Sequence, residues 1–256
     1  MLLRDGALRG RLHELVRAGL DLLYPPVCCG CGASGADLCD RCAQTVEPVP
    51  FPICTRCGRP QSASTMQCTD CRRVAHDPLV WTRAAALHHT PLREAIHAFK
   101  YENRPELGPL LARYLVAAFA QAPWPGVAID AVVPVPLYAE RLAERGYNQA
   151  ERLATPFGAA TGLPVAPDWL ARTRFTRPQV GLGPAERQAN VAGAFTAVTA
   201  VAGRRLLLID DVLTTGATLR AAAHAARVAG AVAVYGLTLA LPHTGVAAAQ
   251  VPDSGV

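Results

Sequence analysis

The chain has 256 residues, enough for one large domain or for a core domain with a small appendage. Apolar residues make up 51% of it, which excludes a largely disordered protein, and aromatic residues only 6%, which argues against an architecture of base-stacking platforms. The formal charge is +5 with histidine neutral, and Lys100 is the only lysine, so the other positively charged side chains are arginines. Arginine binds phosphate with paired hydrogen bonds, so its dominance favours a phosphate-bearing ligand, although a genomic composition bias would give the same count.

The first residues do not resemble a signal peptide, because charged and histidine side chains leave no room for an apolar core before Arg17. No run of about 18 uncharged apolar residues occurs either. The nearest candidate, residues 221–241, is interrupted by His224, Arg227 and Gly230. We therefore expect a cytoplasmic protein without a membrane span, in which thiols stay reduced.

A leading helix is predicted within residues 1–27. Its apolar residues recur at helical spacing and Pro25-Pro26 ends the pattern; they are Leu8, Leu12, Leu15 and Val16. This stripe is expected to pack against the rest of the chain.

The cysteines are confined to the next segment, residues 28–75. Eight of the nine form C-x-x-C pairs, and Gly32 and Gly58 follow the first pair of each half, so the segment is a tandem repeat. Two thiolates at this spacing can point at one ion, and two such pairs complete a closed tetrahedral site. We therefore predict a double zinc-ribbon module whose metal ligands are Cys28, Cys31, Cys39, Cys42, Cys54, Cys57, Cys68 and Cys71.

The alternatives for these cysteines are a disulfide framework, which a reducing compartment disfavours, and a thioredoxin-like redox site, which needs fewer pairs. Closed four-cysteine zinc sites are structural, so chemistry is expected elsewhere. Cys29 is left as a free thiol, and the spacing leaves open whether the pairs combine consecutively or interleave. Two such sites lower the formal charge from +5 to about +1, so global charge gives no support for nucleic-acid binding.

The remainder of the chain alternates between strand and helix patterns. Strands are predicted at 79–88, 129–135, 168–173, 204–210 and 231–241, and helices at 91–101, 106–120, 140–160 and 215–229. This alternation predicts an α/β domain over residues 76–242, with a parallel sheet flanked by helices. Residues 174–184 are predicted to form a mobile loop, and residues 243–256 a disordered tail.

The most informative stretch is L-L-L-I-D-D-V-L-T-T-G-A-T, residues 206–218. An apolar strand brings Asp210 and Asp211 to the carboxyl edge of the sheet, where ligands bind in open α/β folds. A threonine-rich turn with Gly216 then opens a helix, whose N-terminus favours a phosphate. Two carboxylates suit the diol of a ribose. The bland alternative, in which Asp211 or Thr215 only caps the helix, leaves the other polar residues unexplained.

This stretch resembles the 5-phosphoribosyl 1-pyrophosphate (PRPP) motif of type I phosphoribosyltransferases. With the cysteine module, the chain resembles specifically the competence protein F (ComF) family over roughly residues 20–242. Further matches are Pro134-Val135-Pro136-Leu137, Arg145-Gly146-Tyr147-Asn148-Gln149, and residues 172–195 with Gln179, Arg187 and Asn190. The resemblance implies the type I phosphoribosyltransferase fold and a PRPP site made by Asp210, Asp211, Thr214, Thr215, Gly216, Ala217 and Thr218.

Two further segments gain an expected role. The turn Pro136-Leu137-Tyr138 should lie beside the pyrophosphate, although it lacks the small glycine or serine turn of many active transferases. The predicted helix over 140–160 has one polar face, comprising Arg141, Arg145, Asn148 and Arg152, and one apolar face on which Leu142 lies and Gly146 permits close contact with the sheet. We hypothesise that Arg141 and Arg145 reach the diphosphate; a solvated helix face is the alternative.

The resemblance also implies a flexible flap over residues 172–187. Arg174, Arg177 and Arg187 are candidates to cover the departing diphosphate, with Gln179 as a polar contact. An exposed basic loop is the alternative reading. Lys100 is a weaker candidate, because a lone lysine is usually a surface residue.

Two functions lead, and a purely structural zinc module for a partner of the uptake machinery is a third, weaker option. The first is an enzyme that binds PRPP with Mg²⁺ and transfers the phosphoribosyl group with release of pyrophosphate, with Arg145, Arg177 and Arg187 as catalytic candidates. The second, suggested by the same resemblance, is a non-catalytic module of natural competence and DNA uptake, responsive to PRPP or a related ribose 5-phosphate compound. Its partners would be single-stranded DNA, held along patches such as Arg72-Arg73, and other competence proteins. The two readings are compatible.

Overall fold

The structure is a computed structural model that describes residues 25–62, 66–74, 76–174, 191 and 193–242. The predicted leading helix lies outside the described residues up to position 24, and the predicted tail at 243–256 lies outside them entirely. Among the helices in the described part of the chain, none is both long enough and apolar enough to cross a lipid bilayer.

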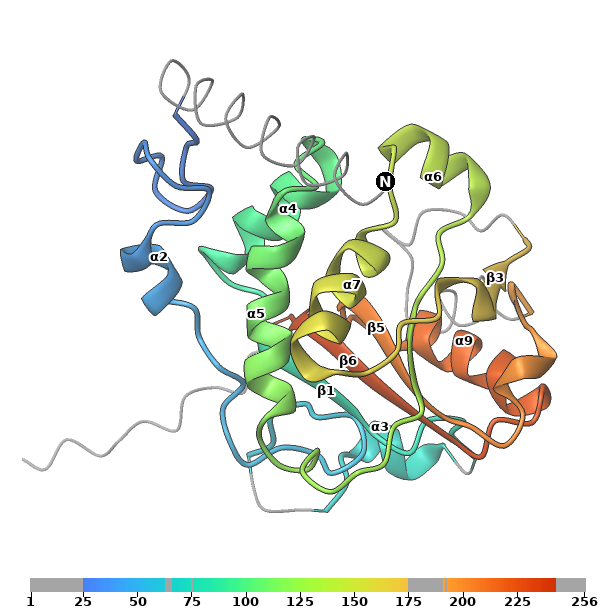
Figure 1. The fold of residues 1–256 in the computed structure, drawn as a ribbon. Coiled ribbons are helices and arrows are strands. Elements are labelled where there is room, and N and C mark those ends of the chain that lie inside the picture. Colours follow the sequence, from blue (N-terminus) through green and yellow to red (C-terminus); the bar gives the residue numbers. More distant parts are fainter. Residues whose placement is uncertain (1–24, 63–65, 75, 175–190, 192, 243–256) are drawn as a thin grey trace, which may run out of the picture.

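Four parallel strands form the central sheet in the order β1-β6-β5-β2 (Figure 1). Their bounds are β1 (Thr82–Leu87), β2 (Ala131–Pro134), β5 (Arg205–Val212) and β6 (Ala233–Leu241). The apolar residues 206–209 of β5 are fully buried, as expected for a strand covered on both faces. Because all four strands run the same way, the segments that follow them meet at one edge of the sheet.

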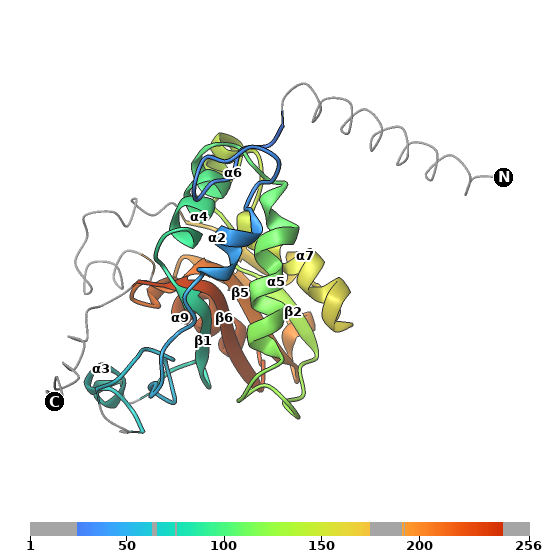
Figure 2. The same ribbon diagram turned by 90° about the vertical axis from the view of Figure 1, so that its left-hand side faces the viewer.

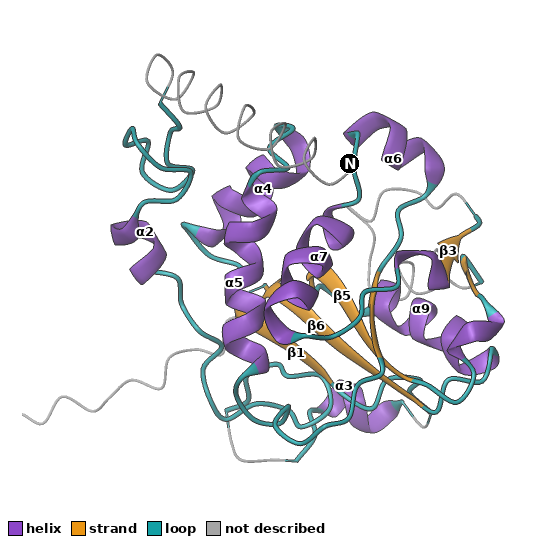
Figure 3. Cartoon of the chain, viewed as in Figure 1, coloured by secondary structure: helices purple, strands orange, loops and turns teal. Residues whose placement is uncertain are grey.

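Helices cover both faces of this sheet (Figure 3). Leu207 and Ile209 of β5 belong to the core beneath α4 (Leu92–Tyr101), α5 (Leu107–Phe119) and α7 (Gln149–Thr161). Leu206 and Leu208 belong to the core beneath α9 (Ala217–Val228). A small antiparallel hairpin, β3 (Leu170–Arg172) with β4 (Phe195–Ala197), packs beside α9; the short helices η1 (Pro167–Trp169) and η2 (Thr199–Val201) flank it. The predicted α/β class, a parallel sheet flanked by helices, is confirmed.

The predicted single helix over 140–160 is wrong. The chain forms α6 (Ala139–Arg145) and α7, separated by Gly146, whose φ of +78° ends the first helix. The side chain of Asn148 then accepts a hydrogen bond from the amide of Ala150 and caps the second helix. A Cβ at Gly146 would meet nothing within 4 Å, so this glycine serves the turn and not a close contact with the sheet. Leu142, expected on the buried face, is 42% exposed.

The two cysteine repeats dock at different places on the sheet domain (Figure 2). The first includes α2 (Asp40–Gln44) and packs its buried Leu38 and two cysteines near Leu110 and Tyr114 of α5. The second includes α3 (Thr69–Arg73) and lies along the beginning of β1, where the amide of Thr82 donates to the carbonyl of Arg56 at 2.7 Å. We call them the first ribbon, residues 28–42, and the second ribbon, residues 54–71.

Candidate functional site

Two groups of four cysteines have the geometry of zinc sites. Cys28, Cys31, Cys39 and Cys42 form one group and Cys54, Cys57, Cys68 and Cys71 the other, with the sulfurs of each group within 4.8 Å of one another. The Sγ–Sγ distance is 3.7 Å for Cys31–Cys39 and 3.8 Å for Cys57–Cys68. A tetrahedron with Zn–S bonds of about 2.3 Å has edges of about 3.8 Å, so both groups fit structural Zn²⁺.

The structure thereby settles the pairing that the spacing left open, because consecutive C-x-x-C pairs combine and do not interleave. None of the nine cysteines forms a disulfide. Backbone amides point at the ligand sulfurs as expected for a knuckle: Cys39 N donates to Cys28 Sγ and Cys68 N donates to Cys54 Sγ, each at 3.3 Å. When bound, zinc cross-links each ribbon, and four protein ligands leave no open position for catalysis.

Cys29, the ninth cysteine, is half-buried beside the first ribbon. Its sulfur accepts a hydrogen bond from Arg104 Nη1 at 3.1 Å, and burial raises the pKa of the thiol. It stays outside both four-cysteine groups, as predicted.

The two aspartates lie within β5, which continues to Val212 beyond the predicted end of the strand. Successive side chains of a strand point to opposite faces of the sheet. Asp211 therefore lies on the face of Leu207 and Ile209, and Asp210 on the other face. The two carboxyl groups therefore lie on opposite faces of the sheet at its carboxyl edge, and they do not form a symmetric pair facing the same way.

Asp211 is fully engaged by neighbours from two helices. Lys100 Nζ, at the end of α4, lies 2.6 Å from Asp211 Oδ1, and Gln149 Nε2, at the start of α7, donates to Asp211 Oδ2 at 2.8 Å. The carboxylate is only 7% exposed. The ammonium of Lys100, together with these hydrogen bonds, lowers the pKa of Asp211 despite its burial. Asp211 is thus held ionised.

Asp210 behaves differently. Its Oδ1 accepts a hydrogen bond from the amide of Asp211 at 2.9 Å. Burial, and then the charge of Asp211, raise the pKa of Asp210 to about 7, against the opposing influence of Lys100 and of Arg172 in β3. Two adjacent carboxyl groups in unequal surroundings therefore differ in protonation, and Asp210 is the one whose charge responds to a nearby cation or hydroxyl.

The predicted phosphate-binding turn follows β5 directly. Gly216 has φ +77° and α9 begins at Ala217, so the helix N-terminus faces the turn. Thr215 Oγ1 accepts a hydrogen bond from the amide of Ala217 at 3.3 Å, but the N-cap residue of α9 is Gly216, which has no side chain to cap the helix, so the alternative that Asp211 or Thr215 caps it is wrong. Thr214, Thr215 and Gly216 form the turn, and Ala217 and Thr218 already belong to the first turn of α9.

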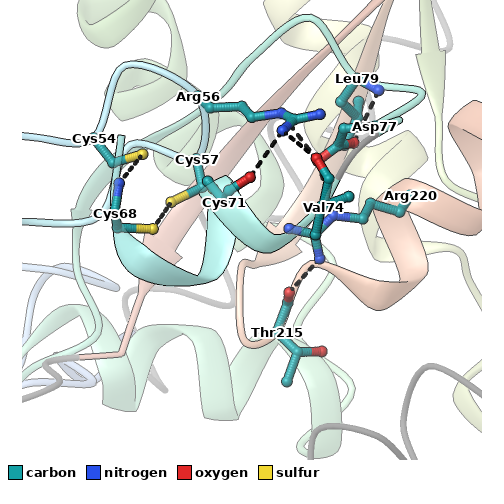
Figure 4. A network of polar contacts seen from close by, with 10 residues as sticks. All are labelled: Cys54, Arg56, Cys57, Cys68, Cys71, Val74, Asp77, Leu79, Thr215 and Arg220. Carbon is teal, nitrogen blue, oxygen red and sulfur yellow. Dashed lines mark hydrogen bonds and ion pairs between the residues drawn. The ribbon is translucent and has the colours of Figure 1, made fainter. Parts of the chain in front are cut away.

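The second ribbon and α9 hold this turn from outside, and Figure 4 shows the part of this network that includes Asp77, Arg220 and Thr215. Arg59 Nη2 donates to the carbonyl oxygen of Thr214, and Arg220 Nη1 of α9 donates to that of Thr215 at 2.9 Å. Asp77, whose side chain is 3% exposed, accepts from Arg220 Nε at 3.1 Å and pairs with Arg56 Nε at 3.5 Å. The sequence gives no signal that distinguishes these arginines from other arginines, because they come close to the turn only in the folded chain.

The predicted arginines fall into three groups. Arg141 is partly exposed and pairs with Glu144 at 2.8 Å within α6. Arg145 lies 5.5 Å from the ring centre of Tyr101 and close enough to Asp211 to lower its pKa. Because the first helix ends at Gly146 and Arg152 belongs to the next one, Arg141 and Arg145 do not share a helix face with Arg152, contrary to expectation. Arg177 and Arg187, with Gln179, lie outside the described residues.

Lys100 is the residue that sequence reasoning undervalued. The expectation of a surface lysine is wrong, because its side chain is 17% exposed and its ammonium is bonded to Asp211. One signal was available: it is the single lysine in a chain that uses arginine everywhere else. Gln149, which appeared only as part of a matched motif, is the second partner of that carboxylate.

Asp211 does not fit a directly bound Mg²⁺. This ion needs several unengaged oxygen ligands, whereas both oxygens of Asp211 already accept bonds from Lys100 and Gln149. The ammonium supplies positive charge at this carboxylate in place of a metal. We therefore derive no step through a protein-held Mg²⁺.

Comparisons with known proteins find relatives of the cysteine module and of most of the chain. A family model described as the double zinc ribbon domain matches residues 19–72. Competence protein F of Haemophilus influenzae is 32% identical over 189 residues, which cover 71% of this chain and 80% of that protein. DNA utilization protein YhgH of Escherichia coli K12 is 31% identical (71% and 79% covered), and competence protein ComFC of Bacillus subtilis is 30% identical (73% and 76%).

Among solved structures, glutamine PRPP amidotransferase from B. subtilis is 26% identical with a TM-score of 0.33; the match covers 53% of this chain and 26% of that enzyme. Adenine phosphoribosyltransferase from Leishmania tarentolae is 16% identical with a TM-score of 0.32, covering 54% and 71%.

Proposed function

Because this chain belongs to the competence protein F family, we propose that it binds PRPP at the end of β5 and transfers its phosphoribosyl group with release of pyrophosphate, in a process of DNA uptake or utilization. Asp210 and Asp211 would bind or position the ribose hydroxyls, and the turn from Thr214 to Thr218 would hold the 5′-phosphate.

One observation carries this proposal. Two adjacent carboxyl groups lie at the carboxyl edge of a buried parallel strand, which leads into a threonine-containing turn at a helix N-terminus, and arginines bind the carbonyls of that turn. A helix N-terminus stabilises the dianionic phosphate, and carboxylates accept hydrogen bonds from a vicinal diol. No other segment of the described chain combines both features.

The transfer needs stabilisation of the leaving group and not a strong acid. The C1–O bond breaks with its electron pair departing on pyrophosphate, a nitrogen lone pair of the acceptor forms the C1–N bond, and the nitrogen proton is released. Arg145, whose charge acts on Asp211, and Arg172, whose charge acts on Asp210, would stabilise the departing charge. Arg141, Arg177 and Arg187 stay predictions for the same role.

The test is titration calorimetry with PRPP and magnesium, followed by measurement of pyrophosphate release. We expect saturable binding that falls at least tenfold in Asp210→Asn and in Thr215→Val, which remove one hydroxyl contact and one turn hydroxyl. Arg227→Ala, at the far end of α9, is the matched control and should bind as the unmodified protein does. Absence of binding by the unmodified protein would refute the proposal. Binding without pyrophosphate release in the presence of nitrogen bases would remove the transferase step.

A second function, binding of single-stranded DNA, is favoured by the printed names of the relatives, which refer to DNA utilization and competence. Arg72 and Arg73 of α3 are exposed side by side and form no ion pair among the described residues. Binding of a labelled oligonucleotide should weaken as salt rises, because phosphate contacts release counterions. An affinity that does not change with salt would contradict phosphate contacts.

A further inference from the structure

A cavity of about 630 Å³ lies between α4 and the segment that follows β5. Its lining includes His88, His97, Lys100 and Tyr101 from the α4 side and Val212 and Thr214 from the β5 side. Two of these residues also belong to the candidate sugar-phosphate site. Lys100 is bonded to Asp211, and Thr214 is the first residue of the turn.

We propose that this cavity is the site of the acceptor, and that it takes a neutral, planar nitrogen heterocycle bearing both hydrogen-bond donors and acceptors. This inference rests on the proposed phosphoribosyl transfer and names the class of its second substrate.

Position supports the assignment. An acceptor nitrogen must come within bonding reach of the sugar carbon whose hydroxyls and phosphate the acid pair and turn would hold. The cavity shares Thr214 with the turn, and Lys100, which also lines it, is bonded to Asp211 of the acid pair. By contrast, the groove between α5 and α7, bordered by Glu106 and Arg152, contains no residue of β5 or of the turn. The cavity of about 350 Å³ under the second ribbon borders the turn on the side where Arg59 and Arg220 bind its carbonyls.

The charges around the cavity disfavour an anionic ligand. Both cations in its lining have a carboxylate partner: Arg93 pairs with Glu94 at 2.7 Å and Lys100 pairs with Asp211 at 2.6 Å. A further carboxylate, Glu102, is hydrogen-bonded to His97 at 3.2 Å. An anionic acceptor would have to displace one of these carboxylates. A size of about 630 Å³ is within the range of small-molecule sites and exceeds what a single ring needs.

The hydrogen-bonding groups support a heterocycle. His88 is half-buried, and burial followed by the charges of Lys100 and Arg93 lowers its pKa, against Asp211 and Glu94. Its ring is therefore neutral and presents one donor and one acceptor nitrogen. Lys100 uses one of its N–H groups on Asp211, and an ammonium carries three. Tyr101, 64% exposed, adds an aromatic surface, with the His97 ring 5.1 Å away.

The experiment uses the full zinc-loaded chain and three probes: ribose 5-phosphate, hypoxanthine as a neutral heterocycle, and orotate as an anionic one. We expect hypoxanthine to bind at least tenfold more tightly than orotate once the protein is saturated with ribose 5-phosphate and pyrophosphate. His88→Ala should weaken hypoxanthine at least tenfold and leave ribose 5-phosphate unchanged.

His89→Ala is the matched control, because this neighbouring histidine is exposed, lies 3.0 Å from Glu47 and does not line the cavity. It should change neither affinity. Should the protein bind ribose 5-phosphate but no hypoxanthine, or should His88→Ala and His89→Ala weaken hypoxanthine equally, the acceptor assignment would be overturned while the proposed sugar-phosphate site stands. Preference for orotate would overturn the neutral class. Failure to bind ribose 5-phosphate at all would instead refute the proposed function.

Discussion

Alanine at Gly58 should destabilise this protein far more than alanine at Gly32. The two glycines hold the same place in the two C-x-x-C-G repeats and share a left-handed backbone, with φ +74° at Gly32 and +73° at Gly58. Their surroundings differ. A Cβ at Gly32 would meet nothing within 4 Å, whereas a Cβ at Gly58 would lie 2.7 Å from the carbonyl oxygen of Thr82.

The magnitude follows from these two terms. The left-handed backbone costs any residue with a Cβ about 1–2 kcal/mol, and this cost applies to both variants. The contact with Thr82 adds an overpacking cost of about 1–3 kcal/mol, because this backbone is paired with Gly236 in the sheet and cannot shift freely. We therefore expect losses in the free energy of unfolding of about 1–2 kcal/mol for Gly32→Ala and about 2–5 kcal/mol for Gly58→Ala.

Urea unfolding followed by tryptophan fluorescence measures both losses. Trp81 precedes β1 and has the Tyr235 ring 4.6 Å away, and Trp124 is buried at 2% exposure, so the signal reports the sheet domain next to the second ribbon. Zinc content is measured in parallel, so that a variant that has lost its metal is recognised. Equal losses for the two variants would refute the conclusion that the second ribbon packs tightly on β1 while the first glycine faces open space.

Three further changes test the electrostatics. Asp210 has a pKa of about 7 in the native protein, above its usual 3.8, so the native state binds more protons than the unfolded state between pH 3.8 and pH 7, and stability falls as pH rises through this range. Asp210→Asn should flatten that decline and be about 1–3 kcal/mol more stable than the unmodified protein near pH 8. Unchanged slopes of stability against pH would contradict this. Lys100→Met leaves the carboxylate of Asp211 buried without its cation and should lower the free energy of unfolding by about 3 kcal/mol. Adding Asp211→Asn in the same chain should restore most of that loss. If thermal unfolding shows that the losses of the two substitutions simply add, the pair does not interact as described. Arg205 holds the pKa of Asp130 at about 2, so this pair stabilises the fold fully above the usual pKa of 3.8 and loses its effect as pH falls through 2. Asp130→Asn should therefore lower the free energy of unfolding by about 1 kcal/mol at neutral pH and by less in acid. A loss of stability that does not depend on pH would contradict the ion pair and point to packing alone.

Several features could be predicted from the sequence because they depend on neighbours along the chain. The C-x-x-C spacing brings two sulfurs to one ion through a local turn, and both four-cysteine groups are present as predicted. The unbroken apolar run before Asp210 predicts a buried strand, and Gly216 followed by an alanine-rich segment predicts a turn and a helix. These are short-range properties, in which backbone geometry and burial act over a few residues.

Local periodicity failed where one residue changed the backbone. The spacing of Arg141, Arg145 and Arg152 predicted one helix face, but Gly146 adopts a left-handed conformation and divides the segment into α6 and α7. A glycine at that position is compatible with either outcome in the sequence.

Only the tertiary structure decided which side chains serve the site. Lys100 reaches Asp211 across 111 positions, and Arg59 reaches the carbonyl of Thr214 across 155. Neither pairing leaves a periodic trace, because each depends on how α4 and the second ribbon dock on the sheet. The sequence determined by itself the parts, namely two zinc ribbons and a strand that ends in acids and a threonine turn. The docking of helices and ribbons on the sheet determined that Asp211 forms an ion pair with a lysine and that an arginine of the second ribbon holds the turn. Docking depends on long-range burial and on charges that come together only on folding.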